Sequence, residues 1–414
     1  FILGFLSDNQ RLADAIARQV PLEGDPQQQV QLLVRLAEIC EGPLNDADRA
    51  RKVWSDLLEI EPTDMRALMA LEQIFQESRN WQDLIGVLRQ RESIQDDEAQ
   101  GRELARRIGE VYERDVRDVD SAIAAYDDVL ARFGADRETL ASLARIYEST
   151  ERWSDLLEVV LSDLDLVSEG PSKTALRFRA ADLMHMRTDD VEGAVERYRE
   201  LLEDAPGHAE TLGALQALRD GDQGAARIAA ARALCEHHER SADFDQLIRS
   251  LEVVAESDDN FERIKVYRRA AEVAEVGLQE VGRAFKMMGM ACRAASNEES
   301  IGAMLKDLAR LARISDSWQP HSDLLLELVP ELLDEELQVR ELLRVAELAR
   351  DRLDDPTLSR NTFAGLLEIR PDHLLALKSL EALHRAAGDH VGLLEVLRRR
   401  TEICDDVPGR QQLL

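Results

Sequence analysis

The stretch AIAAYDDVLARFGADRETLASLARIYESTERWSDLLEVV, residues 122–160, nearly reappears when it is moved back by 72 positions along the chain. The matching residues are Ala122, Tyr126, Leu130, Gly134, Leu140, Tyr147, Trp153 and Leu156 with Ala50, Trp54, Leu58, Pro62, Leu68, Phe75, Trp81 and Leu84. A forward move by the same distance reaches Ala194, Tyr198, Leu202, Pro206 and Leu212. A fixed period with matching residue classes is the signature of stacked supersecondary units. The sequence therefore predicts an array of repeats.

Each period contains four helical segments, because its apolar residues recur every three or four positions. The first segment, residues 46–62, begins near an aspartate that can cap a helix and ends at a proline. The three segments that follow are MRALMALEQIF, WQDLIGVLRQR and RELARRIGEVYERDV. Four helices in 72 residues make two helix pairs of about 36 residues each.

The pattern Ala–x3–Tyr/Trp–x2–Leu/Val–Leu–x3–Pro/Gly begins at Ala50, Ala122 and Ala194. It resembles the second helix of the tetratricopeptide repeat, in which a small residue lets helices approach and an aromatic fills the gap between units. The Leu–x2–Leu–x3–Tyr run in residues 140–147 resembles the first helix of the next unit. The units exceed the typical 34 residues and lack the Trp-x2-Leu-Gly of the family, so we describe them as tetratricopeptide-like. This resemblance covers most of the chain and implies an all-α fold, a right-handed α-solenoid of about 22 stacked antiparallel helices.

A second marker, the W-x-D-L helix start at Trp81 and Trp153, shows where the repeat is interrupted. The equivalent aromatic, Phe244, follows Trp153 by 91 residues, which is longer than one period by about one helix. We therefore predict a regular array over 1–223, an inserted Ala-rich helix at 224–240 and a continuing array over 241–414. The insertion is interpreted either as a hinge, widened groove or docking helix, or as a drifted repeat that merely packs, and the second reading is favoured because arrays often carry insertions.

Both ends of the array are expected to be truncated. The chain begins with Phe, and residues 1–19 read as the end of one helix followed by a whole helix at 9–19. The closing DDVPGRQQLL matches the opening of the helix that begins near Asp97. We therefore expect the chain to be part of a longer protein, in which any signal peptide or anchor would lie outside this sequence.

The composition limits the classes of partner. The chain is 44% hydrophobic and 32% charged, so it can form a core, and 82 acidic against 52 basic residues give a net charge of -30. Such a charge repels phosphate backbones, which argues against nucleic-acid binding. It would favour basic peptides or protein surfaces, although a solubility role explains it more simply. No apolar run approaches the roughly 18 residues of a membrane span.

Two further compositional features concern origin and compartment. Lysine is scarce relative to arginine, a bias that suggests a bacterial genome. The four cysteines are far apart and form no CxxC pair, which favours a reducing compartment and the cytoplasm, while the missing N-terminus leaves the periplasm open. These residues are Cys40, Cys235, Cys292 and Cys404.

Motifs for metal, cofactor or catalytic chemistry are not found. Cys235, His237 and His238 lie at i, i+2 and i+3 on one helix and cannot surround one ion, so we predict no metal site. The acidic pairs at 118/120, 189/190 and 354/355 fit no EF-hand loop and are predicted to cap helices. The stretch EGPSKT lacks the glycines of a phosphate loop. We therefore expect no cofactor and a protein that is not an enzyme.

What remains is a binding surface. In tetratricopeptide arrays the first helices line a concave groove in which ligands usually lie. Carried over to the matching positions of this sequence, the resemblance implies an inner face that includes Arg66, Gln73, Gln76, Glu138, Arg145, Glu148, Lys378 and Arg385. Their mixed charges also fit an ordinary solvated face.

The leading hypothesis is a non-enzymatic scaffold, part of a larger bacterial protein, that binds a protein or peptide in its concave groove. Rigid helices would present rows of polar side chains, so that little ordering cost falls on the scaffold. The alternatives are a sensor or regulatory segment of a signalling protein, and a structural component that self-associates end to end.

Overall fold

The computed structural model describes the backbone of residues 2–222 and 224–403, and the side chains within these ranges from Asp8 onward. All regular structure in these ranges is helical, with 22 α-helices and no strand. The predicted all-α, tetratricopeptide-like solenoid class is therefore confirmed. None of the described helices is both long enough and apolar enough to cross a lipid bilayer.

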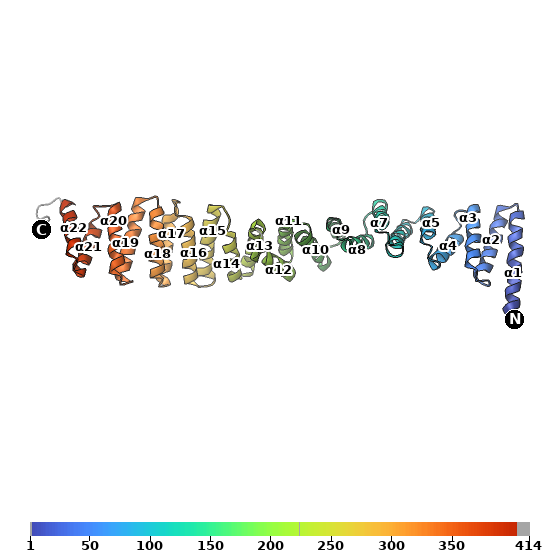
Figure 1. Cartoon of the computed structure of the whole chain (residues 1–414), viewed down its shortest axis with the longest axis horizontal. Coiled ribbons are helices and arrows are strands. Elements are labelled where there is room, and N and C mark those ends of the chain that lie inside the picture. Colours follow the sequence, from blue (N-terminus) through green and yellow to red (C-terminus); the bar gives the residue numbers. More distant parts are fainter. Residues whose placement is uncertain (1, 223, 404–414) are drawn as a thin grey trace. The chain divides into compact units, whose positions relative to one another are not determined.

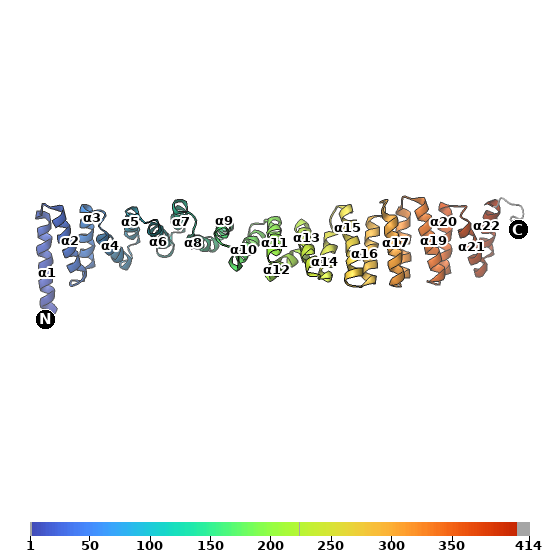
Figure 2. The same ribbon diagram turned by 180° about the vertical axis from the view of Figure 1, so that it is seen from behind.

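The chain forms two compact units, Phe1–Asp189 and Asp190–Leu414. In each unit, helices that follow one another in sequence lie side by side (Figures 1 and 2). Unit 1 contains α1 (Ile2–Gln19), α2 (Pro26–Glu41), α3 (Ala47–Ile60), α4 (Met65–Glu77), α5 (Trp81–Ser93), α6 (Glu98–Glu110), the π-helical turn η2 (Val111–Val116), α7 (Val119–Phe133), α8 (Arg137–Ser149), α9 (Trp153–Leu166) and α10 (Pro171–Arg187), with a short 3-10 turn η1 (Val20–Leu22). The sequence predicted the end of one helix followed by a separate helix at 9–19. This prediction was wrong, because residues 2–19 form a single helix that no proline interrupts.

Unit 2 continues the same alternation of helices and short turns. Its elements are α11 (Val191–Asp204), α12 (Ala209–Asp220), α13 (Gly224–Ser241), α14 (Phe244–Val254), α15 (Asn260–Glu272), the π-helical turn η3 (Val273–Gly277), α16 (Val281–Ala294), α17 (Ile301–Ile314), α18 (Trp318–Leu328), the 3-10 turn η4 (Val329–Glu331), α19 (Glu335–Asp351), α20 (Pro356–Ile369), α21 (Leu374–Ala387) and α22 (His390–Ile403).

A left-handed residue in the connecting turn identifies the helix pairs. Apart from Asp189, which follows α10 at the end of unit 1, such residues are Asn45, Arg79, Arg117 and Glu151 in unit 1, and Ala242, Gln279, Asp316, Asp354 and Gly388 in unit 2. These turns join α2–α3, α4–α5, α6–α7 and α8–α9 in unit 1, and α13–α14, α15–α16, α17–α18, α19–α20 and α21–α22 in unit 2. Left-handed backbone costs a non-glycine residue about 1 kcal/mol, so packing of the paired helices, rather than the turn residue itself, imposes this conformation.

Aspartate side chains begin many of these helices. Asp118 accepts a hydrogen bond from the backbone N–H of Ser121, and Asp190 accepts one from Gly193. Asp355 accepts from the N–H groups of both Thr357 and Leu358. The prediction that these acidic pairs cap helices is confirmed for one aspartate of each pair, whose carboxylate satisfies free N–H groups and complements the helix dipole.

The core of each repeat is formed by the small and aromatic residues that define the period. Ala122 and Tyr126 of α7 are fully buried, as are Ala194 and Tyr198 of α11. Opposite Tyr126, the α6 residue Gly109 has no side chain, and a Cβ built there would lie 2.6 Å from the tyrosine ring. The small residues thus allow neighbouring helices to approach until an aromatic ring fills the space between them.

The Ala-rich segment predicted at 224–240 is a helix, α13, which packs against α11, α12 and α14. The left-handed residue Ala242 lies in the turn between α13 and α14, so α13 is the first helix of this pair. Which helix of this region is the inserted one stays a prediction, because residue 223 between α12 and α13 lies outside the described residues. Residues 404–414, which include Cys404 and the closing segment, lie outside the described residues.

A candidate interaction surface on the first helices

The residues predicted to bind a partner lie on the first helices of the pairs, which in unit 1 include α4, α6, α8 and α10. On these helices, arginine and carboxylate side chains meet across successive repeats. We call these contacts the inter-repeat contacts, and define them as Arg107 with Glu72 and Gln76, Arg106 with Glu138, Arg145 with Glu113, and Arg179 with Glu148.

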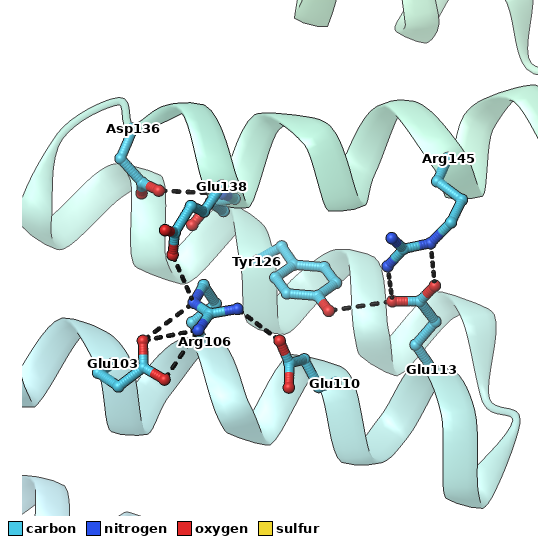
Figure 3. A network of polar contacts seen from close by, with 9 residues as sticks. Glu103, Arg106, Glu110, Glu113, Tyr126, Asp136, Glu138 and Arg145 are labelled. Carbon is cyan, nitrogen blue, oxygen red and sulfur yellow. Dashed lines mark hydrogen bonds and ion pairs between the residues drawn. The ribbon is translucent and has the colours of Figure 1, made fainter.

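Arg106 of α6 is the centre of the first group (Figure 3). Its guanidinium pairs with Glu103 at 2.7 Å and with Glu110 on the same helix, and lies 3.5 Å from Glu138 of α8. The side chain is only 18% exposed. Burial lowers the pKa of Arg106, but the three carboxylates outweigh this effect and raise it. Arg106 therefore remains charged and links α6 to the start of α8.

A second group forms around Glu113 in the π-helical turn η2. The Nε and Nη2 atoms of Arg145 each donate to a different carboxylate oxygen of Glu113 at 2.8 Å, and the Tyr126 hydroxyl donates at 3.0 Å (Figure 3). Burial alone would raise the pKa of Glu113, yet the hydrogen bonds from Arg145 and Tyr126 hold it below its usual value. The ionised carboxylate thus links α6, α7 and α8.

A third group surrounds Glu72 of α4, which is only 8% exposed. It forms ion pairs with Arg91 of α5 and Arg107 of α6. Burial and the neighbouring Arg107 lower the pKa of Arg91. The Nη2 atom of Arg107 also donates to the Oε1 atom of Gln76 at 2.9 Å. A buried carboxylate with two guanidinium partners is compensated, and loss of either partner would leave it poorly solvated.

Four of the eight predicted binding residues take part in the inter-repeat contacts. Gln76 meets Arg107, Glu138 meets Arg106, and Arg145 holds Glu113. Glu148 of α8 accepts from Arg179 of α10 at 3.1 Å. These side chains therefore help to fix one first helix against the next, a role for which sequence reasoning gave no expectation.

The other four make local contacts or none. Arg66 pairs with the N-cap Asp64 at 2.6 Å, and Arg385 pairs with Glu381 at 2.8 Å. The Gln73 amide donates to Glu77 at 2.9 Å. The exposed Lys378 has no ion pair or hydrogen bond within the described part of the chain. The structure therefore does not gather the eight residues into one cluster, and their role in binding remains a prediction.

The arginines and carboxylates on the other side of these contacts were missed at the sequence level. The sequence does contain a signal for these residues. Each contact joins an arginine to a carboxylate or, for Gln76, an amide that lies 31 to 35 positions away, which is about the length of one helix pair. A search for opposite charges one repeat apart would have found Glu72, Arg106, Arg107, Glu113 and Arg179.

The bidentate pair of Arg145 and Glu113 gives a measurable coupling. Replacing both residues by alanine, singly and together, is expected to show a coupling free energy of about 1 kcal/mol, because half of the Arg145 side chain is solvent-exposed and exposed pairs contribute little more. Urea unfolding of the four proteins measures it. If the free energies of unfolding lost in the two single variants add up to the loss in the double variant, the pair makes no net contribution to stability.

A cleft of about 670 Å³ opens between α6 and α8. It is lined by Asp97, Glu98, Ala99, Arg102, Glu103, Arg106, Asp136, Arg137 and Glu138. Three of its carboxylates, those of Glu98, Glu103 and Glu138, keep more than half of their side-chain surface exposed. The cleft is thus an acidic groove with fixed walls, open to a partner from the solvent.

Paired antiparallel helices, repeated along each unit with clefts between successive first helices, define an all-α helical repeat protein. The family model described as tetratricopeptide repeat matches residues 139–174, which span α8, α9 and the start of α10. This match supports the tetratricopeptide-like repeat that the sequence predicts. Such a fold suggests a scaffold for protein–protein interaction, and scaffolds of this kind are typically non-enzymatic.

Several solved structures resemble the chain. The Naa15/Naa10 complex bound to HypK-THB is 12% identical with a TM-score of 0.29, and the match covers 93% of this chain and 64% of that chain, so this chain spans less than two thirds of it. A tetratricopeptide repeat protein from Parabacteroides merdae is 14% identical with a TM-score of 0.28, covering 67% and 98%. The TPR2AB domain of yeast Sti1 in complex with pHSP90 is 17% identical with a TM-score of 0.21, covering 64% and 90%. Among curated proteins, none matches the chain.

Proposed function

We propose that the chain is a non-enzymatic scaffold that binds a protein or peptide on the faces of its first helices, as part of a larger bacterial protein. The observation that carries this proposal is the cleft between α6 and α8, whose lining includes five carboxylates and three arginines. A basic peptide segment would complement the excess of negative charge there.

The inter-repeat contacts support this function by holding the groove in shape. Arg106 and Glu113 link α6 to α8 before any partner arrives. A preformed surface loses little conformational entropy on binding, so more of the contact energy contributes to affinity. Polar residues that face the groove thus have two effects, since they fix its walls and supply its charge.

The test is capture of partners from a lysate of the source organism by the purified chain. The groove variant carries Glu98→Lys and Glu138→Lys, which reverse two exposed charges in the cleft. The control carries Asp56→Lys and Glu59→Lys, the same change of charge at exposed positions of the second helix α3. We expect a protein that the wild type and the control capture and the groove variant loses, with at least a tenfold reduction.

Other outcomes decide against the proposal. A partner retained equally by both variants would move the interface away from the first helices. A partner lost equally from both would indicate non-specific attraction to the negative surface. No captured partner, together with a sedimentation coefficient that rises with protein concentration, would point to a structural array.

A further inference from the structure

A cleft of about 1080 Å³ in unit 2 lies between the first helices α15 and α17. Unlike the acidic cleft of unit 1, it has an apolar floor, formed by the buried side chains of Ile264, Met288 and Leu311. Phe261, in the first turn of α15, lines the cleft and is 78% exposed. A phenylalanine left in solvent beside an apolar floor is typical of a surface that a partner covers.

The free charges of this cleft lie on different sides. Lys265 and Arg268 are exposed on α15, whereas Glu298 and Glu299 are exposed in the turn that precedes α17. Among the described residues, none of the four has an ion-pair or hydrogen-bond partner for its side chain. The α15 side therefore presents unpaired positive charge, and the start of the α17 side presents unpaired negative charge.

The other charged groups of the cleft are already paired. Arg269 forms an ion pair with Glu272 at 2.8 Å, and Arg310 of α17 pairs with Glu275 of the π-helical turn η3, with one contact at 2.9 Å. The Arg310 pair ties the end of the α15 segment to α17 and fixes the distance between the walls. The free charges are thus separate from the groups that hold the cleft in shape.

We propose that this cleft binds an amphipathic helix of a partner protein, with an apolar stripe on the floor and on Phe261, acidic residues on the flank that faces α15, and basic residues on the flank that faces Glu298 and Glu299. The inference rests on the proposed scaffold function and names the chemistry of one of its partners. An amphipathic helix matches a groove between two helices, because apolar residues at i, i+3, i+4 and i+7 form one stripe with polar flanks. Opposite charges on the two sides fix the direction of the bound helix and exclude helices whose flanks carry one charge.

Three fluorescein-labelled synthetic peptides test the proposal. Each is about 18 residues long, which is enough for helix formation, and carries the same leucine stripe. One has glutamate on one flank and lysine on the other, the second has lysine on both flanks, and the third has glutamate on both. For the wild-type chain, fluorescence anisotropy should show the mixed peptide binding about tenfold tighter than either of the others, with weaker binding as salt increases.

Reversing the charge of the α15 wall should change which of the peptides binds most tightly. With Lys265→Glu and Arg268→Glu, both sides of the cleft become acidic, and the peptide with two lysine flanks should now bind about tenfold tighter than the mixed one. Phe261→Ala should weaken all three peptides about tenfold. The control, Arg249→Glu with Lys286→Glu on the second helices α14 and α16, changes the net charge equally and should keep the wild-type order.

An unchanged peptide order after reversal of the α15 wall, or no preference for the mixed peptide in the wild type, would overturn the inference. Lysate capture separates this failure from that of the scaffold function. A partner lost from the Glu98→Lys/Glu138→Lys variant but retained by the Lys265→Glu/Arg268→Glu variant would keep the proposed function and reject an amphipathic helix in the unit 2 cleft.

Discussion

Gly109→Ala is expected to destabilise unit 1 by about 2 kcal/mol, although alanine is the better helix former. A Cβ at Gly109 would lie 2.6 to 2.9 Å from three carbons of the Tyr126 ring. The ring is fully buried and its hydroxyl is bound to Glu113, so it cannot move aside without breaking this contact. The cost of overpacking therefore exceeds the gain in helix propensity. The midpoint of urea unfolding, with its slope, measures the change.

Gly86 provides the matched control, because it lies within α5 of the same unit and a Cβ added at that position would meet no other atom within 4 Å. Gly86→Ala should stabilise the unit by up to about 1 kcal/mol. Combining Gly109→Ala with Tyr126→Leu should cost less than the sum of the two single changes, since the smaller side chain makes room for the Cβ. If Gly109→Ala were as stable as the wild type, α6 and α7 would not depend on this close approach.

Acidification from pH 7 to pH 4 is expected to cost unit 2 about 3 kcal/mol through His321 alone. The imidazole is 1% exposed in α18, and neither ring nitrogen has a hydrogen-bond partner among the described residues. Burial, and to a smaller extent the charge of Arg344, lowers the pKa of His321 from 6.5 to about 4. The unfolded chain therefore takes up a proton below pH 6.5 that the folded chain does not accept until about pH 4. Stability contributed by the neutral ring is present above pH 6.5 and is lost as the pH falls through this window.

Urea unfolding at several pH values checks this prediction against His321→Leu. The leucine variant should be at least as stable as the wild type at pH 7, because the unpartnered nitrogens are removed, and should lose about 3 kcal/mol less by pH 4. His390→Leu, at an exposed position in α22, should keep the wild-type pH dependence. Equal pH dependence of the wild type and His321→Leu would show that the ring is solvated in the folded protein.

The fold could be predicted from the sequence because its signal repeats. Ala50, Ala122 and Ala194 all lie in buried contacts between helices, and the aromatic residue four positions later is buried in each case. The residues of the same helix–helix interface thus recur along the chain. Their period alone therefore predicts the helices, their pairing and their order in the array. Features outside the repeated pattern were not predictable in this way. The π-helical turns at 111–116 and 273–277 follow α6 and α15 in stretches whose apolar spacing is that of an ordinary helix.

The candidate site was predicted less well, for a physical reason. Repeat patterns locate the first helices, but they do not tell whether a polar residue on them faces solvent or meets the next repeat. Arg145 was predicted to contact a partner and is found to hold Glu113. Phe261, the exposed aromatic residue of the unit 2 cleft, stands outside the repeat pattern and was not predicted. Whether a charged side chain forms an ion pair, and how exposed a single side chain is, depend on its neighbours in three dimensions. The period of the sequence does not predict these neighbours.

The sequential packing of helices within each unit also determines how that unit responds to tension. Because each helix packs mainly on its neighbours along the chain, a force applied at the two ends of a unit passes through every helix interface in series. The weakest interface yields first, while the remaining pairs stay folded and carry the load. Stretching a single unit should therefore lengthen it in steps of one or a few helices, so that each unit behaves as a compliant molecular spring rather than as a rigid strut.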